Sequence, residues 1–139
     1  VEAGNPRNEM YATQNAYRQV KELTGLTGAD MDIFFANDFY NQSGFLSAEM
    51  CEYLPKGEGW QYTKEGRIAY DGDRPINTNG GRCQYGHAAG ASGLHDVYEA
   101  VRQMRGDAGA TQVHHDVKHA MLRGFGGSQN VLNIMMERK

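Results

Sequence analysis

A glycine-rich stretch leads directly into the clearest amphipathic helix of this sequence. Residues 77–93 hold five glycines and a single histidine, His87. Apolar residues then recur at the i, i+3, i+4, i+7 and i+10 positions of one helical face, namely Leu94, Val97, Tyr98, Val101 and Met104. Glycine adopts positive φ and lets another group approach closely. We therefore predict a tight turn that delivers His87 to the start of a helix.

Helical periodicity alternates with short apolar segments along the rest of the chain. A first helix is predicted to be capped by Asn8 and to end near Gly25, with Met10, Tyr17, Val20 and Leu23 on its apolar face. The remaining predictions are a helix over 44–53 and strands over 31–35, 111–113, 119–122 and 131–135. Residues 55–81, rich in Gly, Asp and Asn, are predicted to form a long loop. This alternation indicates an α/β fold.

Length and charge exclude several classes of protein. The 139 residues, with a formal net charge of −3, fit one domain over 1–139. The mixed charges argue against a nucleic-acid partner, and no apolar run approaches the ~18 residues of a membrane span. No signal peptide is visible. Because the chain begins at Val1, a processed product, a trimmed chain and a fragment all stay open.

The two cysteines and the paired histidines predict neither a disulfide scaffold nor a metal site. Cys51 and Cys83 are interpreted as reduced thiols of a cytoplasmic protein. His115 and His119 have the i, i+4 spacing that suits zinc on a helix, but their surroundings resemble a strand, so no metal is predicted.

Two glycine-rich turns are candidates for chemistry. Free N–H groups at the start of a helix favour anions, so His87 is predicted to act on developing negative charge; the alternative is that it only braces its loop. The glycines of the Gly124-Phe125-Gly126-Gly127 turn have N–H groups that can form an oxyanion pocket, although a tight hairpin explains them equally well.

Taken together, these segments resemble the C-terminal half of a thiolase, in particular the sterol-carrier-protein-type (SCP-x, lipid-transfer-like) branch. The resemblance covers about residues 8–136, nearly the whole chain. It rests on an ordered series of motifs: Asn77-Thr78-Asn79-Gly80-Gly81, then Gly86-His87-Ala88-Ala89-Gly90-Ala91-Ser92-Gly93, then Tyr98-Glu99-Ala100-Val101-Arg102-Gln103-Met104-Arg105-Gly106-Asp107-Ala108-Gly109, and finally Gly126-Gly127. The implied fold is one half of a thiolase, with a layered mixed sheet and helices.

The resemblance assigns roles to some residues, but at two positions this chain lacks the catalytic side chain of the family. His87 inherits the role of holding the thioester oxygen and the enolate, and the N–H of Gly126 that of a second oxyanion donor. The family's acid/base cysteine corresponds to Gly124, and its water-positioning Asn or His to Ala36. The residues expected to contact substrate are Gly86, Gly90, Ser92, Gly127 and Asn37.

The implied activity is the cleavage or formation of a carbon–carbon bond in an acyl-CoA, so coenzyme A enters as part of the substrate. The nucleophilic cysteine of thiolases lies in an N-terminal half that this sequence does not contain, so that half is expected either as a separate partner chain or as a missing segment. Two alternatives remain. One is a retro-aldolase of β-hydroxyacyl-CoA, including steroid side chains, with a DUF35-type OB-fold partner. In that scheme Tyr85 is a candidate proton-transfer residue and Tyr40 a weaker one. The other is a non-catalytic acyl-CoA-binding or structural subunit.

Overall fold

A computed structural model describes residues 6–40, 42–126 and 130–139, with side chains from Tyr11 onward. Its helices are α1 (Pro6–Thr24), α2 (Ser43–Met50), α3 (Gly59–Lys64), α4 (Gly81–Tyr85) and α5 (Ser92–Arg105). Two short 3-10 helices lie at η1 (Gly28–Asp30) and η2 (Gly109–Thr111), and the strands are β1 (Ile33–Ala36), β2 (His119–Phe125) and β3 (Val131–Glu137). The α/β expectation is confirmed.

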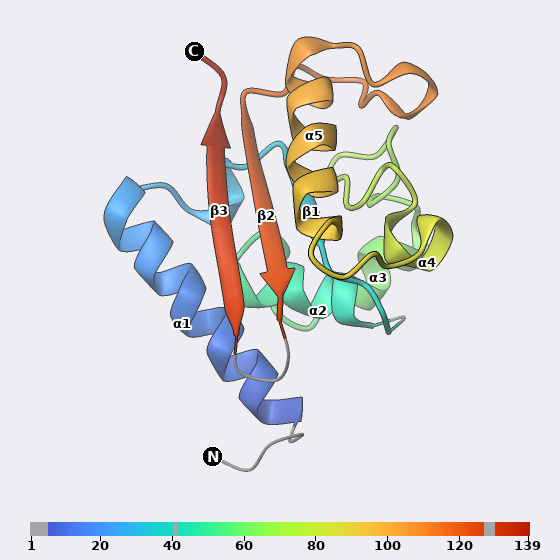
Figure 1. The fold of residues 1–139 in the computed structure, drawn as a ribbon. Coiled ribbons are helices and arrows are strands. Elements are labelled where there is room, and N and C mark those ends of the chain that lie inside the picture. Colours follow the sequence, from blue (N-terminus) through green and yellow to red (C-terminus); the bar gives the residue numbers. More distant parts are fainter. Residues whose placement is uncertain (1–5, 41, 127–129) are drawn as a thin grey trace.

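The strands form one mixed sheet in the order β1-β2-β3 (Figure 1). β1 runs parallel to β2, with Ile33 opposite Ala120, and β2 runs antiparallel to β3, with Phe125 opposite Val131. A single bridge adds Ile76 to the free edge of β1 at Phe34. Because β1 and β2 are parallel, their carboxyl ends reach the same edge of the sheet.

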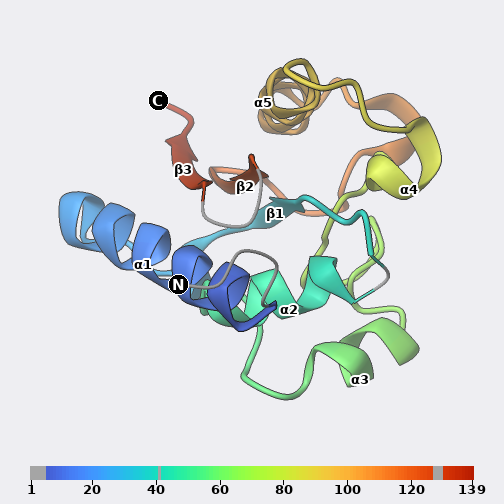
Figure 2. The same cartoon turned by 60° about the horizontal axis from the view of Figure 1, so that its bottom comes forward.

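Helices cover both faces of the sheet: α5 lies on one side, and α1 and α2 lie on the other (Figure 2). The side chains of β1 alternate between the two faces, and all four of its residues are fully buried. Phe34 packs into the core beneath α1 and α2 with Tyr17, Ala48 and Met121. On the α5 side, the core residues are Ile33, Phe35, Ala100, Met104, Val113, Val117, Ala120 and Leu122.

Several local predictions need correction. The first helix begins at Pro6, so Asn8 lies inside it rather than capping it. Leu23, predicted on the buried face of that helix, is 85% exposed. The loop predicted over 55–81 contains the short helix α3. Met10 lies outside the residues whose side chains are described.

The strand predicted over 111–113 is instead a 3-10 turn followed by extended chain. The side chain of Gln103 forms hydrogen bonds with the backbone of this segment. Its Nε2 donates to Thr111 O at 2.7 Å, and its Oε1 accepts the N–H of Val113 at 3.0 Å. The backbone groups that a neighbouring strand would have paired are thus bonded to a buried amide.

The burial of α5 also differs from the apolar face that its sequence predicts. Leu94 is 72% exposed and Tyr98 58% exposed, whereas Asp96 and Gln103 face inward at 2% and 1%. Both inward polar groups have partners in the protein, so their burial leaves no unpaired charge. The helix therefore packs one partly polar face on the sheet and leaves apolar side chains outside.

Candidate functional site

His87 lies in the loop between α4 and α5, where glycine makes the backbone turn possible. Gly86 ends α4 with φ +83°, and Gly90 has φ +81°, both in the left-handed region that favours glycine. The His87 side chain is exposed. Its Nδ1 lies 3.0 Å from Ser92 Oγ, and its ring meets the ring of Phe39 edge-on, with 4.6 Å between centroids. The predicted turn that presents His87 before α5 is present.

Phe39 connects the His87 loop to the carboxyl ends of both parallel strands. Phe39 follows β1, and its ring also lies 6.3 Å from that of Phe125, the last residue of β2. The guanidinium of Arg123 lies 5.1 Å from the centre of the Phe125 ring. The sheet topology thus brings together His87, the segment after β1 and the glycine-flanked end of β2.

Residues 36–38, which follow β1, are held firmly in place. The Asn77 side chain pairs with the backbone of Ala36, accepting its N–H at 2.8 Å and donating to its carbonyl at 3.0 Å. The carboxylate of Asp38 accepts the N–H of Arg82 at 2.7 Å, and a Cβ on Gly81 would lie only 2.0 Å from that carboxylate. The sequence analysis did not predict this pairing of Asn77, although the residue belongs to the Asn-x-x-Gly-Gly motif.

Two of the predicted substrate-contacting residues are buried. Asn37 is 2% exposed, and its Oδ1 has no hydrogen-bond partner in the described part of the chain. Ser92 is 4% exposed, and its hydroxyl is bonded to the His87 loop. Gly86 and Gly90 are exposed, and a Cβ on either would meet no atom within 4 Å. Gly86 and Gly90 are therefore accessible to a ligand, whereas Ser92 and Asn37 face the protein.

The two glycines near the end of β2, Gly124 and Gly126, differ in the groups with which their backbones pair. Gly124, where the resemblance places a cysteine, pairs within the sheet opposite Leu132. The N–H of Gly126 donates to Asn130 O at 2.7 Å across the hairpin. The oxyanion role predicted for Gly126 therefore requires that this hydrogen bond be exchanged for one to the substrate. Gly127 lies outside the described residues.

Tyr85 is 38% exposed, and its hydroxyl contacts a buried ion pair. Arg82 and Asp96 form a two-pronged ion pair with distances of 2.5 and 2.6 Å, and both side chains are 2% exposed. The Tyr85 hydroxyl accepts from Arg82 Nη1 at 2.7 Å and donates to Asp96 Oδ1 at 3.2 Å. Burial, together with the charge of Asp96, raises the pKa of the Tyr85 phenol to about 12. Its proton is thus held on the oxygen at neutral pH and shared with a carboxylate. Tyr40, the other tyrosine considered, is 68% exposed.

Among the side chains that the structure describes, no group of three or more His, Cys, Asp and Glu is arranged so that it could hold a metal ion. His115 Nε2 lies 3.1 Å from the carbonyl of Asp32, and His119 lies 3.7 Å from Glu137. The two histidines thus contact different groups. In the same described part of the chain, no helix is long and apolar enough to cross a membrane.

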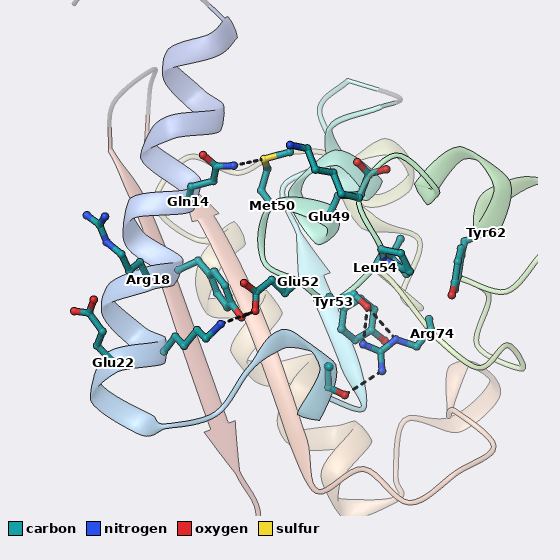
Figure 3. Close-up of a pocket in the computed structure, with 15 residues that line it drawn as sticks. Gln14, Arg18, Glu22, Glu49, Met50, Glu52, Tyr53, Leu54, Tyr62 and Arg74 are labelled. Carbon is teal, nitrogen blue, oxygen red and sulfur yellow. Dashed lines mark hydrogen bonds and ion pairs between the residues drawn. The ribbon is translucent and has the colours of Figure 1, made fainter.

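A pocket of about 920 Å³ opens on the other face of the sheet, between α1 and the segment after α2 (Figure 3). Several of its charged side chains are bonded within the protein: Glu52 accepts from Tyr17 at 2.7 Å and from Lys21 at 2.8 Å, and Arg74 donates to the carbonyl of Tyr53 at 2.6 Å. The hydrogen bonds from Lys21 and then Tyr17 lower the pKa of the Glu52 carboxyl. None of the predicted site residues lines this pocket.

Comparisons with known proteins agree with this arrangement. The family described as "Thiolase C-terminal domain-like" matches residues 5–136. The chain is 36% identical over 117 residues to an acetyl-CoA acetyltransferase of Methanothermobacter thermautotrophicus, covering 84% of this chain and 30% of that protein. It is 30% identical over 126 residues to the benzoylsuccinyl-CoA thiolase subunit BbsB of Thauera aromatica, covering 91% and 33%. Human sterol carrier protein 2 is 35% identical over 101 residues, covering 73% and 18%.

A solved structure confirms the fold. The Ltp2-ChsH2(DUF35) aldolase superposes with a TM-score of 0.71 at 22% identity, covering 90% of this chain and 31% of that one. The chain spans about a third or less of the length of these relatives. The matched residues, the layered α/β sheet and the glycine-flanked histidine loop agree: the chain belongs to the thiolase family, as a domain of the C-terminal type.

Proposed function

We propose that this domain is part of an enzyme that cleaves or forms a carbon–carbon bond in an acyl-CoA thioester, and that His87 stabilises negative charge on the thioester oxygen. The observation that carries the proposal is the placement of His87. Its imidazole is exposed and is braced by Ser92 and Phe39 beside the carboxyl ends of β1 and β2. A hydrogen-bond donor fixed in advance at such a position stabilises an enolate or tetrahedral oxyanion without reorganising.

In this proposal an N-terminal-type thiolase half supplies the nucleophile. Cys51 is buried, and burial raises the pKa of its thiol to about 12, so it is a poor nucleophile in the folded chain. Cys83 is exposed, but its thiol donates to Asp38 O at 3.0 Å and its pKa is also raised, by partial burial and by the charge of Asp38. Neither described thiol has the environment of an activated cysteine.

We expect the N-terminal-type thiolase half to pack on the outward face of α5. Leu94 and Tyr98, one helical turn apart, are 72% and 58% exposed on the helix that covers this side of the sheet (Figure 2). Large apolar side chains that are adjacent and exposed mark an interaction surface. We therefore place the contact with the remainder of the enzyme on this face of α5.

Retro-aldol cleavage is the second candidate, and Gly124 is the observation that favours it. Thiolysis requires an acid/base group at that position, whereas retro-aldol cleavage of a β-hydroxyacyl-CoA requires only a base for the hydroxyl proton and a stabiliser for the enolate. The Tyr85 oxygen would accept the proton of the substrate hydroxyl while the phenol passes its own proton to Asp96 Oδ1. The Cα–Cβ bond then breaks to release a carbonyl product, and the proton held on Asp96 returns through Tyr85 to the enolate carbon. Arg82 and Asp96 hold the phenol for this transfer. A DUF35-type OB-fold protein would be the partner.

Replacing His87 separates these enzymes from a non-catalytic subunit. Thiolysis of acetoacetyl-CoA and cleavage of a β-hydroxyacyl-CoA are measured in the native assembly carrying His87→Ala. Loss of one oxyanion donor lowers turnover by about 10²–10³-fold, and the substrate affected identifies the reaction. His114→Ala is the matched control, because that ring is also exposed and also meets an aromatic ring edge-on, that of Tyr70. If turnover in the assembly is unchanged in His87→Ala, the domain has a binding or structural role.

Determining which chains the native assembly contains tests the identity of the proposed partner. Its intact mass should reveal either a longer chain or a co-purifying thiolase half, and Leu94→Asp on α5 should weaken that association. A small OB-fold chain in the assembly would favour the aldolase. Leu132→Asp, at a comparably exposed leucine on β3, is the matched control.

A further inference from the structure

The phenol of Tyr85 is held at its oxygen. Tyr85 is the last residue of α4, a helix of five residues that ends at Gly86 with φ +83°. Its hydroxyl accepts from Arg82 Nη1 and donates to Asp96 Oδ1, which uses both hydrogen-bonding roles of a phenol. These two hydrogen bonds fix where the oxygen lies, but the ring can still tilt about it. The side of the oxygen that a further partner can reach changes with that tilt.

A histidine ring from α5 packs against this phenol. The ring centroids of His95 and Tyr85 lie 4.4 Å apart, with 51° between the ring planes. Aromatic rings in contact prefer particular tilted or offset arrangements, so the contact restricts the orientation of both rings. His95 directly precedes Asp96 in the sequence. The same turn of α5 therefore supplies the acceptor for the Tyr85 hydroxyl and the contact for its ring.

His95 is itself held by groups from two segments of the chain. Its Nδ1 lies 3.5 Å from Asn79 Nδ2, in the segment before α4, and its Nε2 lies 3.7 Å from Glu99 Oε1, one turn further along α5. Glu99 is 6% exposed, so its carboxylate has little room to move. The side chain of His95 is 38% exposed, so it can be replaced without opening the core.

We propose that His95 is a positioning residue that fixes the tilt of the Tyr85 ring, and with it the side of the phenol oxygen that meets the substrate hydroxyl. This assignment rests on the proton transfer by Tyr85 in the retro-aldol reaction proposed above. Proton transfer requires a hydrogen bond of about 2.6–3.2 Å between the two groups. Misplacing a reacting group by ~1 Å can lower the rate about 10²-fold. His95 acts through Tyr85 and exchanges no proton with the substrate.

Cleavage of β-hydroxyacyl-CoA esters of increasing chain length by the native assembly, beginning with 3-hydroxybutyryl-CoA, tests the assignment. His95→Ala removes the ring contact and should lower kcat by up to about 10²-fold with KM unchanged, because the tilt of the phenol affects the transfer step. His95→Phe restores an aromatic ring that cannot ionise, and it should regain most of kcat. His114→Ala, which removes a histidine ring from Tyr70 instead, is the matched control and should change neither constant.

NMR spectra of the same assembly, with ¹³C-labelled tyrosine and histidine in this chain, give a readout that does not depend on activity. We expect nuclear Overhauser effects between the ring protons of Tyr85 and His95, and faster flipping of the Tyr85 ring in His95→Ala than in His95→Phe. Absence of that contact would overturn the proposal, as would an unchanged kcat in His95→Ala or a kcat that His95→Phe leaves equally low.

Failure of the proposed reaction gives a different result. Unchanged cleavage in Tyr85→Phe, or no cleavage of any ester, would refute proton transfer by Tyr85 and with it the catalytic consequence of His95. The spectra would then still decide whether His95 fixes the Tyr85 ring. If instead Tyr85→Phe abolishes cleavage and His95→Ala does not lower it, the reaction stands and the positioning role is refuted.

Discussion

Replacing Asp96 by asparagine would leave the guanidinium of Arg82 buried without a counter-charge. Both side chains of this ion pair are 2% exposed, and the asparagine amide would offer one acceptor oxygen in place of the two that Arg82 now bonds. Removing one partner of a buried pair costs about 3–5 kcal/mol. That is a large part of the about 5–15 kcal/mol that stabilises a typical domain. Asp96→Asn should therefore lower the free energy of unfolding by this amount.

Urea unfolding followed by circular dichroism measures this change. With a slope of about 1–3 kcal/mol per molar urea, the midpoint should fall by roughly 2 M. The matched control is Asp116→Asn, because the Arg138–Asp116 pair is 41% and 72% exposed and contributes about 0–1 kcal/mol. Arg82→Met combined with Asp96→Leu should regain most of the loss. Equal costs for Asp96→Asn and Asp116→Asn would refute the reasoning, because burial would then make no difference.

The cysteines and a buried glycine give three further predictions. In the native chain at neutral pH, a thiol reagent should label Cys83, which is exposed, and should reach Cys51 only on unfolding; equal rates would contradict the burial of Cys51. Because burial raises the pKa of Cys51 from 9.0 to about 12, its stabilising effect is complete below pH 9 and is lost as the pH rises toward 12. The free energy of unfolding should thus fall less over that range in Cys51→Ser. Finally, Gly28→Ala should cost more than about 2 kcal/mol, because the new Cβ would lie 1.9 Å from the carbonyl oxygen of Cys51; Gly93→Ala, with no atom within 4 Å, should cost nothing, and similar unfolding midpoints would refute the steric argument.

Elements with strong local periodicity could be predicted from sequence, whereas elements held by side chains from elsewhere could not. The helix predicted over 94–104 is α5, and the apolar run before Asn37 is β1. Residues 111–113 have strand-like composition but are bonded to the Gln103 side chain, a contact that periodicity cannot reveal. The buried face of α5 was also mispredicted, because Asp96 becomes compatible with the interior only through Arg82.

The candidate site likewise has some features that the sequence predicted and others that it did not. His87 was predicted from the glycines around it, because a turn at positive φ is a local property of the chain. The burial of Ser92, the bond of Gly126 to Asn130 and the bracing of His87 by Phe39 all depend on segments distant in sequence or on the course of a loop. Which polar groups are exposed follows from packing rather than composition.

By itself, the sequence determined the α/β class, the thiolase-like series of motifs and the turn that presents His87, because each depends on short-range pattern and backbone freedom. Only the tertiary structure decided that Asp96 faces inward with Arg82, that Ser92 turns toward His87 rather than toward solvent, and that Leu94 stays outside. The physical reason is that buried polar groups are in most cases hydrogen-bonded, and only folding brings their partners together.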